Sequence, residues 1–154
     1  MARTTLACIA VLSFSAAAYA DGSVARFEGG IGSQPLRAGG TPNLVFGAAP
    51  GGVPWVISQL SADVKSDGRI SVAGRGLLVG GGNGIGTNAN QSVHARLLCN
   101  GIPFETHALV PLEADGDFRI DDTLVPPPPA NCAPATLLII NGSGSWFAAG
   151  IPKL

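Results

Sequence analysis

The chain has 154 residues, of which 22 are glycine and 12 are proline, and its formal net charge at pH 7 is −1. Only 12% of the residues are charged and 6% are aromatic, so a core has to be built from Val, Ile, Leu and Ala. This weak charge provides no electrostatic footprint for nucleic acid or for an anionic membrane. No stretch after the first twenty residues is long and apolar enough to span a bilayer, so we expect no transmembrane segment.

The first twenty residues have the pattern of an export signal. Arg3 gives a positive start, residues 6–18 form an apolar run, and Ala18-Tyr19-Ala20 is a small-x-small cleavage site. Cleavage after Ala20 would leave one domain, residues 21–154, with eight basic and ten acidic side chains. We therefore expect a periplasmic or secreted protein.

Two cysteines, Cys99 and Cys132, follow the predicted signal. An exported protein meets an oxidising compartment, which favours a Cys99–Cys132 disulfide. The alternative is a nucleophilic or metal-binding thiol.

The first part of the expected domain is rich in turns. Residues 24–28 alternate as a strand does, and residues 29–52 form a loop-rich segment that holds a short strand candidate at residues 44–46. No window shows a 3.6-residue apolar period free of Gly and Pro, so we expect no helix.

Residues 55–79 predict a long β-hairpin. A three-residue loop at Ser66-Asp67-Gly68 pairs Val64 with Ile70, and this register continues to Ala62–Val72, Leu60–Gly74 and Val56–Leu78. This register places apolar side chains on one face of the hairpin and polar side chains on the other. A two-residue turn would mix apolar and polar side chains on both faces. We expect Gly68 to adopt the left-handed conformation.

A glycine-rich loop at residues 80–90 follows the hairpin and is the candidate binding loop. It contains no phosphate-binding motif, although consecutive N–H groups could form an anion-binding nest. The alternative is a mobile surface loop. The candidate residues are Gly80, Gly82, Asn83, Gly84, Gly86, Thr87, Asn88 and Asn90.

A second hairpin is predicted around Asn100-Gly101, which favours a type I′ turn. Its register places the only two histidines, His94 and His107, opposite each other, with Asp121 on the same face. Two imidazoles and a carboxylate would suit Zn²⁺ or Cu²⁺. The alternative is an ordinary polar pair on an exposed strand, which needs no cofactor.

Two more hairpins complete the chain. Residues 112–120 repeat the Asp-Gly turn pattern and pair Leu112 with Phe118 and Val110 with Ile120, although Pro111 cannot donate to a ladder. Residues 136–140 and 146–151 are apolar on both faces, which is typical of central strands. Seven to eight strands indicate an antiparallel β-sandwich, with a small β-barrel as the alternative.

The chain resembles small exported proteins of Gram-negative bacteria that have no assigned activity. The resemblance rests on Gly84-Ile85-Gly86-Thr87-Asn88, Asp67-Gly68-Arg69 and the terminal segment at residues 146–152. It implies an exported location and transfers no catalytic or binding residue.

For function, a non-enzymatic binding or structural module is favoured, because the loops lack catalytic groupings. Its partner, a protein or a small molecule, and its oligomeric state are open. The alternatives are a metal-binding protein that uses His94 and His107, and an uncharacterised hydrolase.

Overall fold

The computed structural model describes residues 22–154, and this part of the chain contains eleven β-strands and no helix. The predicted all-β class is confirmed. The signal peptide predicted at residues 1–20 lies outside the described residues.

Nine strands form one antiparallel sheet with the order β7-β6-β10-β11-β1-β3-β4-β9, and β8 lies beside β6. The nine strands are β1 (Ser23–Gly32), β3 (Gln59–Lys65), β4 (Arg69–Arg75), β6 (Ser92–Cys99), β7 (Ile102–Glu105), β8 (Val110–Pro111), β9 (Phe118–Thr123), β10 (Ala135–Asn141) and β11 (Trp146–Pro152). The other two, β2 (Trp55–Val56) and β5 (Leu78–Val79), pair with each other.

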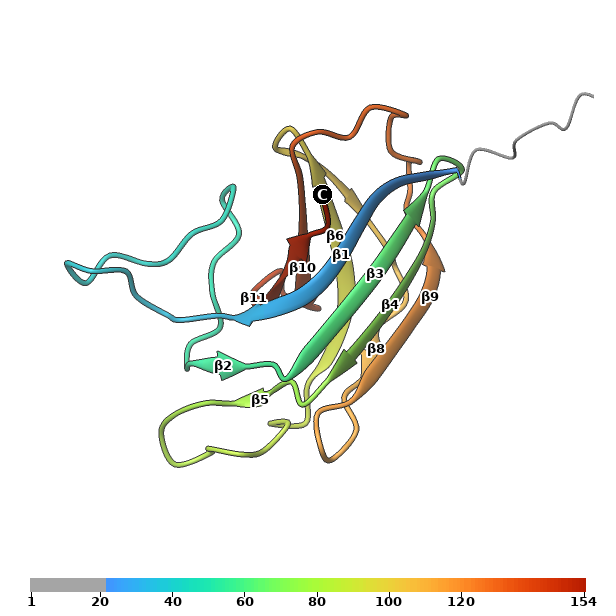
Figure 1. Cartoon of the computed structure of the whole chain (residues 1–154). Helices are drawn as coiled ribbons and strands as arrows, with labels where there is room; N and C mark the ends of the chain where they lie inside the picture. The colour runs from blue at the N-terminus through green and yellow to red at the C-terminus, as the bar shows by residue number, and fades with distance from the viewer. Residues whose placement is uncertain (1–21) are drawn as a thin grey trace, which may run out of the picture.

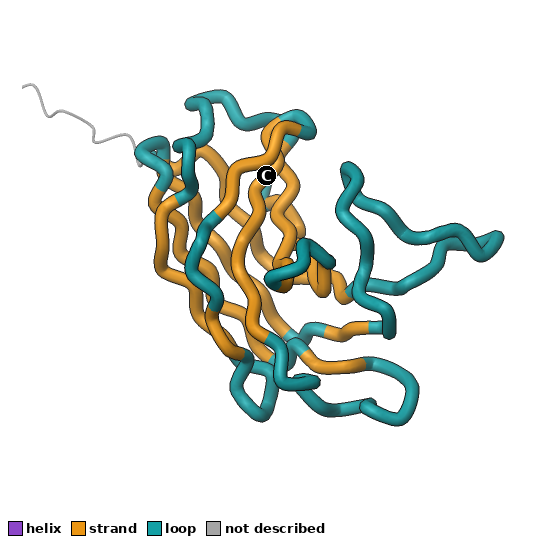
Figure 2. The backbone as a smooth tube through the Cα atoms, turned by 180° about the vertical axis from the view of Figure 1, so that it is seen from behind, coloured by secondary structure: helices purple, strands orange, loops and turns teal. Residues whose placement is uncertain are grey.

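The large sheet curls so that its two halves face each other around the core (Figures 1 and 2). Its two ends meet where the N–H of Val125, just beyond β9, donates to the carbonyl of Glu105 in β7 at 3.0 Å. The curl places alternate side chains of every long strand inside, as Leu60, Ala62 and Val64 of β3 show. This enclosed core is mostly aliphatic, and it also holds five aromatic side chains, those of Phe27, Trp55, Phe104, Phe118 and Phe147.

The predicted hairpin at residues 55–79 is confirmed in register. Val64 pairs with Ile70 and Leu60 with Gly74 in the large sheet, while Val56 pairs with Leu78 in the small one. Gly68 has a φ of +91°, so the three-residue loop has its left-handed glycine. Alternating burial along β3 and β4 explains why this register is fixed.

The last hairpin occupies the middle of the sheet, as predicted. β10 lies between β6 and β11, and both of its faces are buried. Leu137 and Ile139 enter the enclosed core, while Leu138 and Ile140 enter a second apolar cluster on the outer face. An outer cluster of this kind has to be covered by another part of the chain.

The predicted hairpin at residues 112–120 is wrong in its pairing. A tight turn does form, with the Glu113 N–H donating to the Asp117 carbonyl at 2.9 Å. However, β9 pairs with β4, where Ile120 lies opposite Val72, and β8 pairs with β6. Pro111 supplies no N–H for a ladder with β9, so the turn does not continue into a hairpin.

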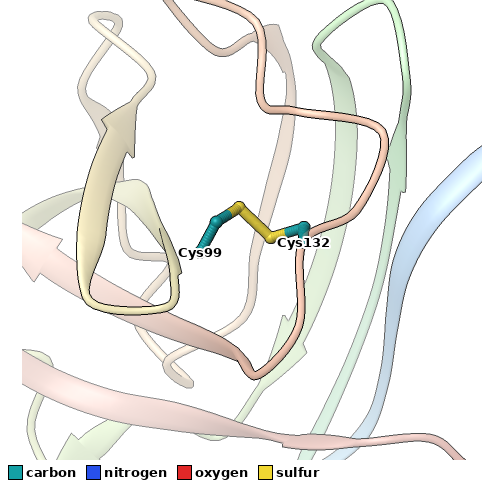
Figure 3. Close-up of a disulfide and its surroundings, with 2 residues drawn as sticks. All are labelled: Cys99 and Cys132. Carbon is teal, nitrogen blue, oxygen red and sulfur yellow. A yellow bond between two sulfur atoms is a disulfide. The ribbon is translucent and has the colours of Figure 1, made fainter.

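The predicted disulfide is confirmed. Cys99 ends β6 and Cys132 lies in the segment between β9 and β10, and the two are bonded within the core cluster (Figure 3). Neither thiol is therefore free to act as a nucleophile or metal ligand. Among the described residues, no helix is long and apolar enough to cross a membrane.

Candidate functional site

A long segment at residues 33–54 leaves the sheet between β1 and β2, and we call it the arm. It stands away from the sheet in both views of the molecule (Figures 1 and 2). Its base is fixed at Ser33, whose N–H donates to the Phe147 carbonyl and whose carbonyl accepts from the Trp55 N–H, both at 2.8 Å. The arm therefore starts from a rigid position on the sheet.

The arm covers the outer apolar cluster of β10 and β11. Ala48 is buried in this cluster and Val45 packs against it, beside Leu138 and Ile140. The indole N–H of Trp146 donates to the Asn43 carbonyl at 3.0 Å. These contacts explain why the last hairpin is apolar on both faces, and they hold the arm in one conformation.

A two-residue turn at Phe46 and Gly47 is the most unusual feature of the arm. Val45 and Ala48 exchange two backbone hydrogen bonds, of 3.0 and 2.9 Å, and both residues between them have positive φ, +46° and +82°. This is the pattern of a type I′ turn, which favours Asn, Asp or Gly at its first central position. A bulky aromatic residue in the left-handed region carries a strain of roughly 1–2 kcal/mol.

The strained residue is also exposed. Phe46 is 62% exposed, and its ring lies next to Gly101 in the turn between β6 and β7. Three further aliphatic side chains on the arm or beside that turn are more than half exposed, and we call these three and Phe46 together the arm surface. The three are Leu36 (57%), Leu44 (51%) and Ile102 (61%).

Replacing Phe46 by asparagine should stabilise the protein. Asparagine tolerates the left-handed region and is preferred in type I′ turns, while the exposed ring loses little packing. We expect the free energy of unfolding to rise by about 0.5–1 kcal/mol. Urea unfolding of F46N and the wild type measures this, and a lower stability of F46N would show that the ring supports the fold.

The candidate binding loop at residues 80–90 is held by its own hydrogen bonds. The N–H groups of Ile85 and Thr87 donate to carbonyls of the same segment, and the N–H of Gly86 donates to the Val79 carbonyl in β5, so these three are not available for an anion. The side-chain amide of Asn88 donates to the carbonyls of Leu112 and Glu113, both at 3.0 Å. The loop is therefore tied to the turn before β9, and six of its eight candidate residues are exposed, as is Ile85.

The predicted cross-strand pairing of His94 with His107 does not form. The pairs Leu97–Phe104 and Arg96–Glu105 form as predicted, but β7 ends at Glu105 and Val93 pairs with Val110. Residues 107–109 therefore bulge out of the ladder, and His107 does not lie in register opposite His94. Within residues 22–154, no group of three or more His, Cys, Asp or Glu side chains could hold a metal ion.

Two members of that predicted metal site, His94 and Asp121, have other partners. The His94 Nδ1 lies 2.7 Å from the Thr106 carbonyl. Asp121 accepts a hydrogen bond from Ser71 at 2.6 Å and pairs with Arg119 at 2.6 Å, and these two contacts lower the pKa of its carboxyl. Of the three predicted ligands, His94 and Asp121 thus have partners elsewhere on the sheet, and His107 is exposed outside the strands.

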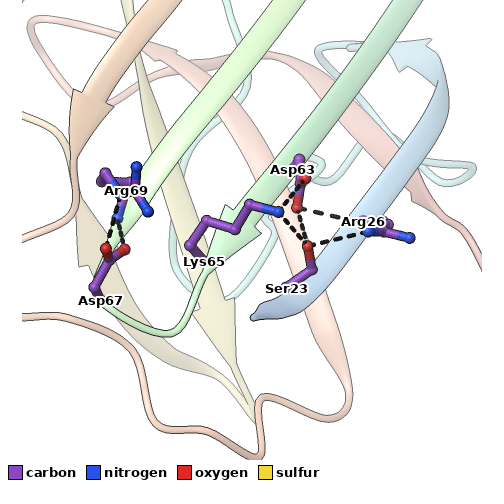
Figure 4. Close-up of polar contacts among 6 residues, drawn as sticks. All are labelled: Ser23, Arg26, Asp63, Lys65, Asp67 and Arg69. Atoms are coloured by element: carbon purple, nitrogen blue, oxygen red, sulfur yellow. Dashed lines mark hydrogen bonds and ion pairs between the residues drawn. The ribbon is translucent and has the colours of Figure 1, made fainter. Parts of the chain in front are cut away.

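Polar side chains form a connected network on β1 and β3 (Figure 4). Ser23 donates to Asp63 at 2.6 Å, and Lys65 lies 2.9 Å from the same carboxylate. Partial burial acts to raise the pKa of Asp63. Hydrogen bonds from Ser23 and Lys65, with the charges of Lys65 and Arg26, outweigh that effect and lower the pKa below its ordinary value.

The pKa of Asp63 predicts a pH dependence of stability. Because the pKa of Asp63 is lowered in the folded state, ionised Asp63 stabilises the fold. This contribution to the free energy of unfolding is fully present above the unfolded pKa, about 3.9, and is lost as the pH falls through the folded pKa. We expect D63N to lose less stability than the wild type when the pH is lowered below about 4. Thermal unfolding across that range measures the difference, and parallel curves would contradict the assignment.

A shallow hollow of about 490 Å³ lies on the outer face of β1, β3 and β4. Gln59, Ser61 and Arg75 contribute to its walls, with Glu28 on the opposite side. Arg75 makes no ion pair within the described part of the chain, whereas Glu28 pairs with Lys153. A small polar molecule would fit here, but the side chains are exposed and none is strained.

No family model, curated protein or solved structure matches this chain. The candidate site therefore rests on its own geometry. Sequence reasoning missed Phe46, because residues 44–46 were expected to be a strand, and the Phe46-Gly47 pair between Val45 and Ala48 was the available turn signal.

Proposed function

We propose that this protein is an exported, non-enzymatic binding module that docks through the arm surface. The observation that carries the proposal is Phe46, an aromatic residue that is both exposed and in a left-handed conformation. Strain of this kind persists where surrounding structure imposes it, and it clusters at functional sites. The Cys99–Cys132 disulfide supports an oxidising compartment and thus a periplasmic or secreted location.

The turn itself disfavours a phenylalanine at this position. Val45 and Ala48 anchor the turn to the outer cluster, while Phe46 is not part of that cluster and is 62% exposed. The similar turn at residues 100–101 has Asn100 at the same position, with a φ of +50°. A chain selected for stability alone would favour asparagine in both turns.

Site-specific photocrosslinking tests this proposal in the cells that produce the protein. A benzophenone-bearing phenylalanine analogue is placed at Phe46, and the same analogue at Ile85 is the matched control, because Ile85 is 66% exposed on a different loop. We expect an adduct that depends on position 46. Equal adducts at both positions, or none at position 46, would contradict docking through the arm.

A further inference from the structure

We propose that the arm surface binds the surface of a lipid bilayer, with Phe46 and the three aliphatic side chains of that surface entering the interface between headgroups and acyl chains. This inference rests on the proposed function, because it names the partner of the same surface. Three observations support a lipid partner: the charge of the arm, its backbone hydrogen bonds and the position of its apolar side chains.

Charge is almost absent from this part of the chain. Between Glu28 and Asp63 the only charged residue is Arg37. Arg37 takes part in none of the ion pairs among the described residues. An apolar surface with one unpaired cation and no acid has little desolvation cost at a lipid interface, and its single charge favours anionic headgroups. The net charge of the whole chain does not show that this segment carries a single charged residue.

Many backbone N–H groups of the arm also donate hydrogen bonds within the arm. Six N–H groups between residues 37 and 48 donate to carbonyls of the arm itself, at 2.8–3.1 Å. Prolines at positions 35, 42, 50 and 54 remove four further donors. A loop enters an apolar medium at low cost only when few polar groups lose water without gaining a partner.

Apolar side chains are exposed where the arm turns. Phe46 lies in the Val45–Ala48 turn, and Leu36 lies next to a second narrow loop, where it bridges Pro42. Protruding apolar side chains suit a deformable apolar surface. A protein partner would gain specificity from paired charges and hydrogen bonds, and the arm offers few side chains for either. The observations therefore favour lipid over protein.

Vesicle flotation tests the inference with the full processed chain. The probes are vesicles of phosphatidylglycerol with phosphatidylethanolamine, and vesicles of phosphatidylcholine alone. The variants are F46N and R37Q, and I85N is the matched control, because it also replaces an exposed aliphatic residue by asparagine. Circular dichroism and urea unfolding of each variant establish that it is folded.

We expect the wild type and I85N to float with anionic vesicles, also at high salt, because apolar burial drives the binding. F46N should bind at least about tenfold more weakly. R37Q should reduce binding to the anionic vesicles by up to about fivefold and leave binding to phosphatidylcholine unchanged.

Two outcomes would overturn the lipid assignment. One is that the wild type floats with neither kind of vesicle, and the other is that F46N floats as well as the wild type. If a position-46 adduct with a protein accompanies either outcome, docking through the arm stands and the lipid partner falls. If no such adduct forms, both proposals fall.

Discussion

Replacing Gly32 by alanine should lower the free energy of unfolding by about 3 kcal/mol, the upper end of the usual cost of overpacking. A Cβ atom on Gly32 would lie 1.9 Å from the Trp55 carbonyl oxygen and 2.7 Å from the Val56 Cα. Both are backbone atoms, so no side chain can rotate away. The main chains at the base of the arm would have to separate, which also disturbs the hydrogen bond from the Trp55 N–H to Ser33.

Gly52 provides the matched control for this prediction. A Cβ atom there would meet nothing within 4 Å, and the residue does not have positive φ. G52A should therefore be neutral or stabilising by up to about 1 kcal/mol, through the reduced entropy of the unfolded chain. Urea unfolding of the two variants measures the contrast. Equal stabilities of G32A and G52A would show that the close approach at Gly32 is not a constraint.

Loss of the Cys99–Cys132 disulfide should have an effect of similar size. The bond joins residues 33 positions apart, and closing a loop of that length contributes about 3–4 kcal/mol in the chain-entropy account. The bonded residues also lie in the core, where each fills space beside the ends of β6 and β10. The double variant C99A/C132A should therefore unfold at a markedly lower urea concentration.

Adding a reductant distinguishes the contribution of the covalent bond to stability from the contribution of the packing of the sulfur atoms. The wild type should lose most of this stability when it is reduced, whereas the double variant should not respond to reductant. If the wild type unfolds at the same urea concentration with and without reductant, the disulfide does not stabilise the domain.

Local pairings could be predicted from the sequence. The Ser66-Asp67-Gly68 loop and the Asn100-Gly101 turn each join two strands with clear alternation, so burial of one face allows a single register. The apolar character of residues 136–140 likewise indicated central strands. The all-β class followed directly from these elements.

Partners that are distant in the sequence could not be predicted. Nothing in residues 112–120 shows that β9 pairs with β4, because alternation fixes which face is buried but not the neighbouring strand. The predicted pairing of His94 with His107 failed for the same reason. It extended the register of Arg96 and Glu105 by two residues, and the bulge at residues 107–109 ended it.

The exposure of the side chains on the arm surface depends on backbone conformation, which the amino-acid composition does not show. The segment at residues 29–52 is rich in Gly and Pro, and this indicated a loop without showing which side chains face water. Val45 and Phe46 are neighbours of similar hydrophobicity, yet the first packs against the outer cluster and the second is exposed. Only the positive φ of Phe46 distinguishes a strained residue from an ordinary exposed one.

The central claim is that Phe46 is kept for binding at the expense of stability. Its most direct test is to measure the urea unfolding and the vesicle flotation of F46N and the wild type in the same preparations. We predict opposite changes, with F46N more stable and at least about tenfold weaker in binding. A variant that is less stable than the wild type, or one that binds equally well, would contradict the claim.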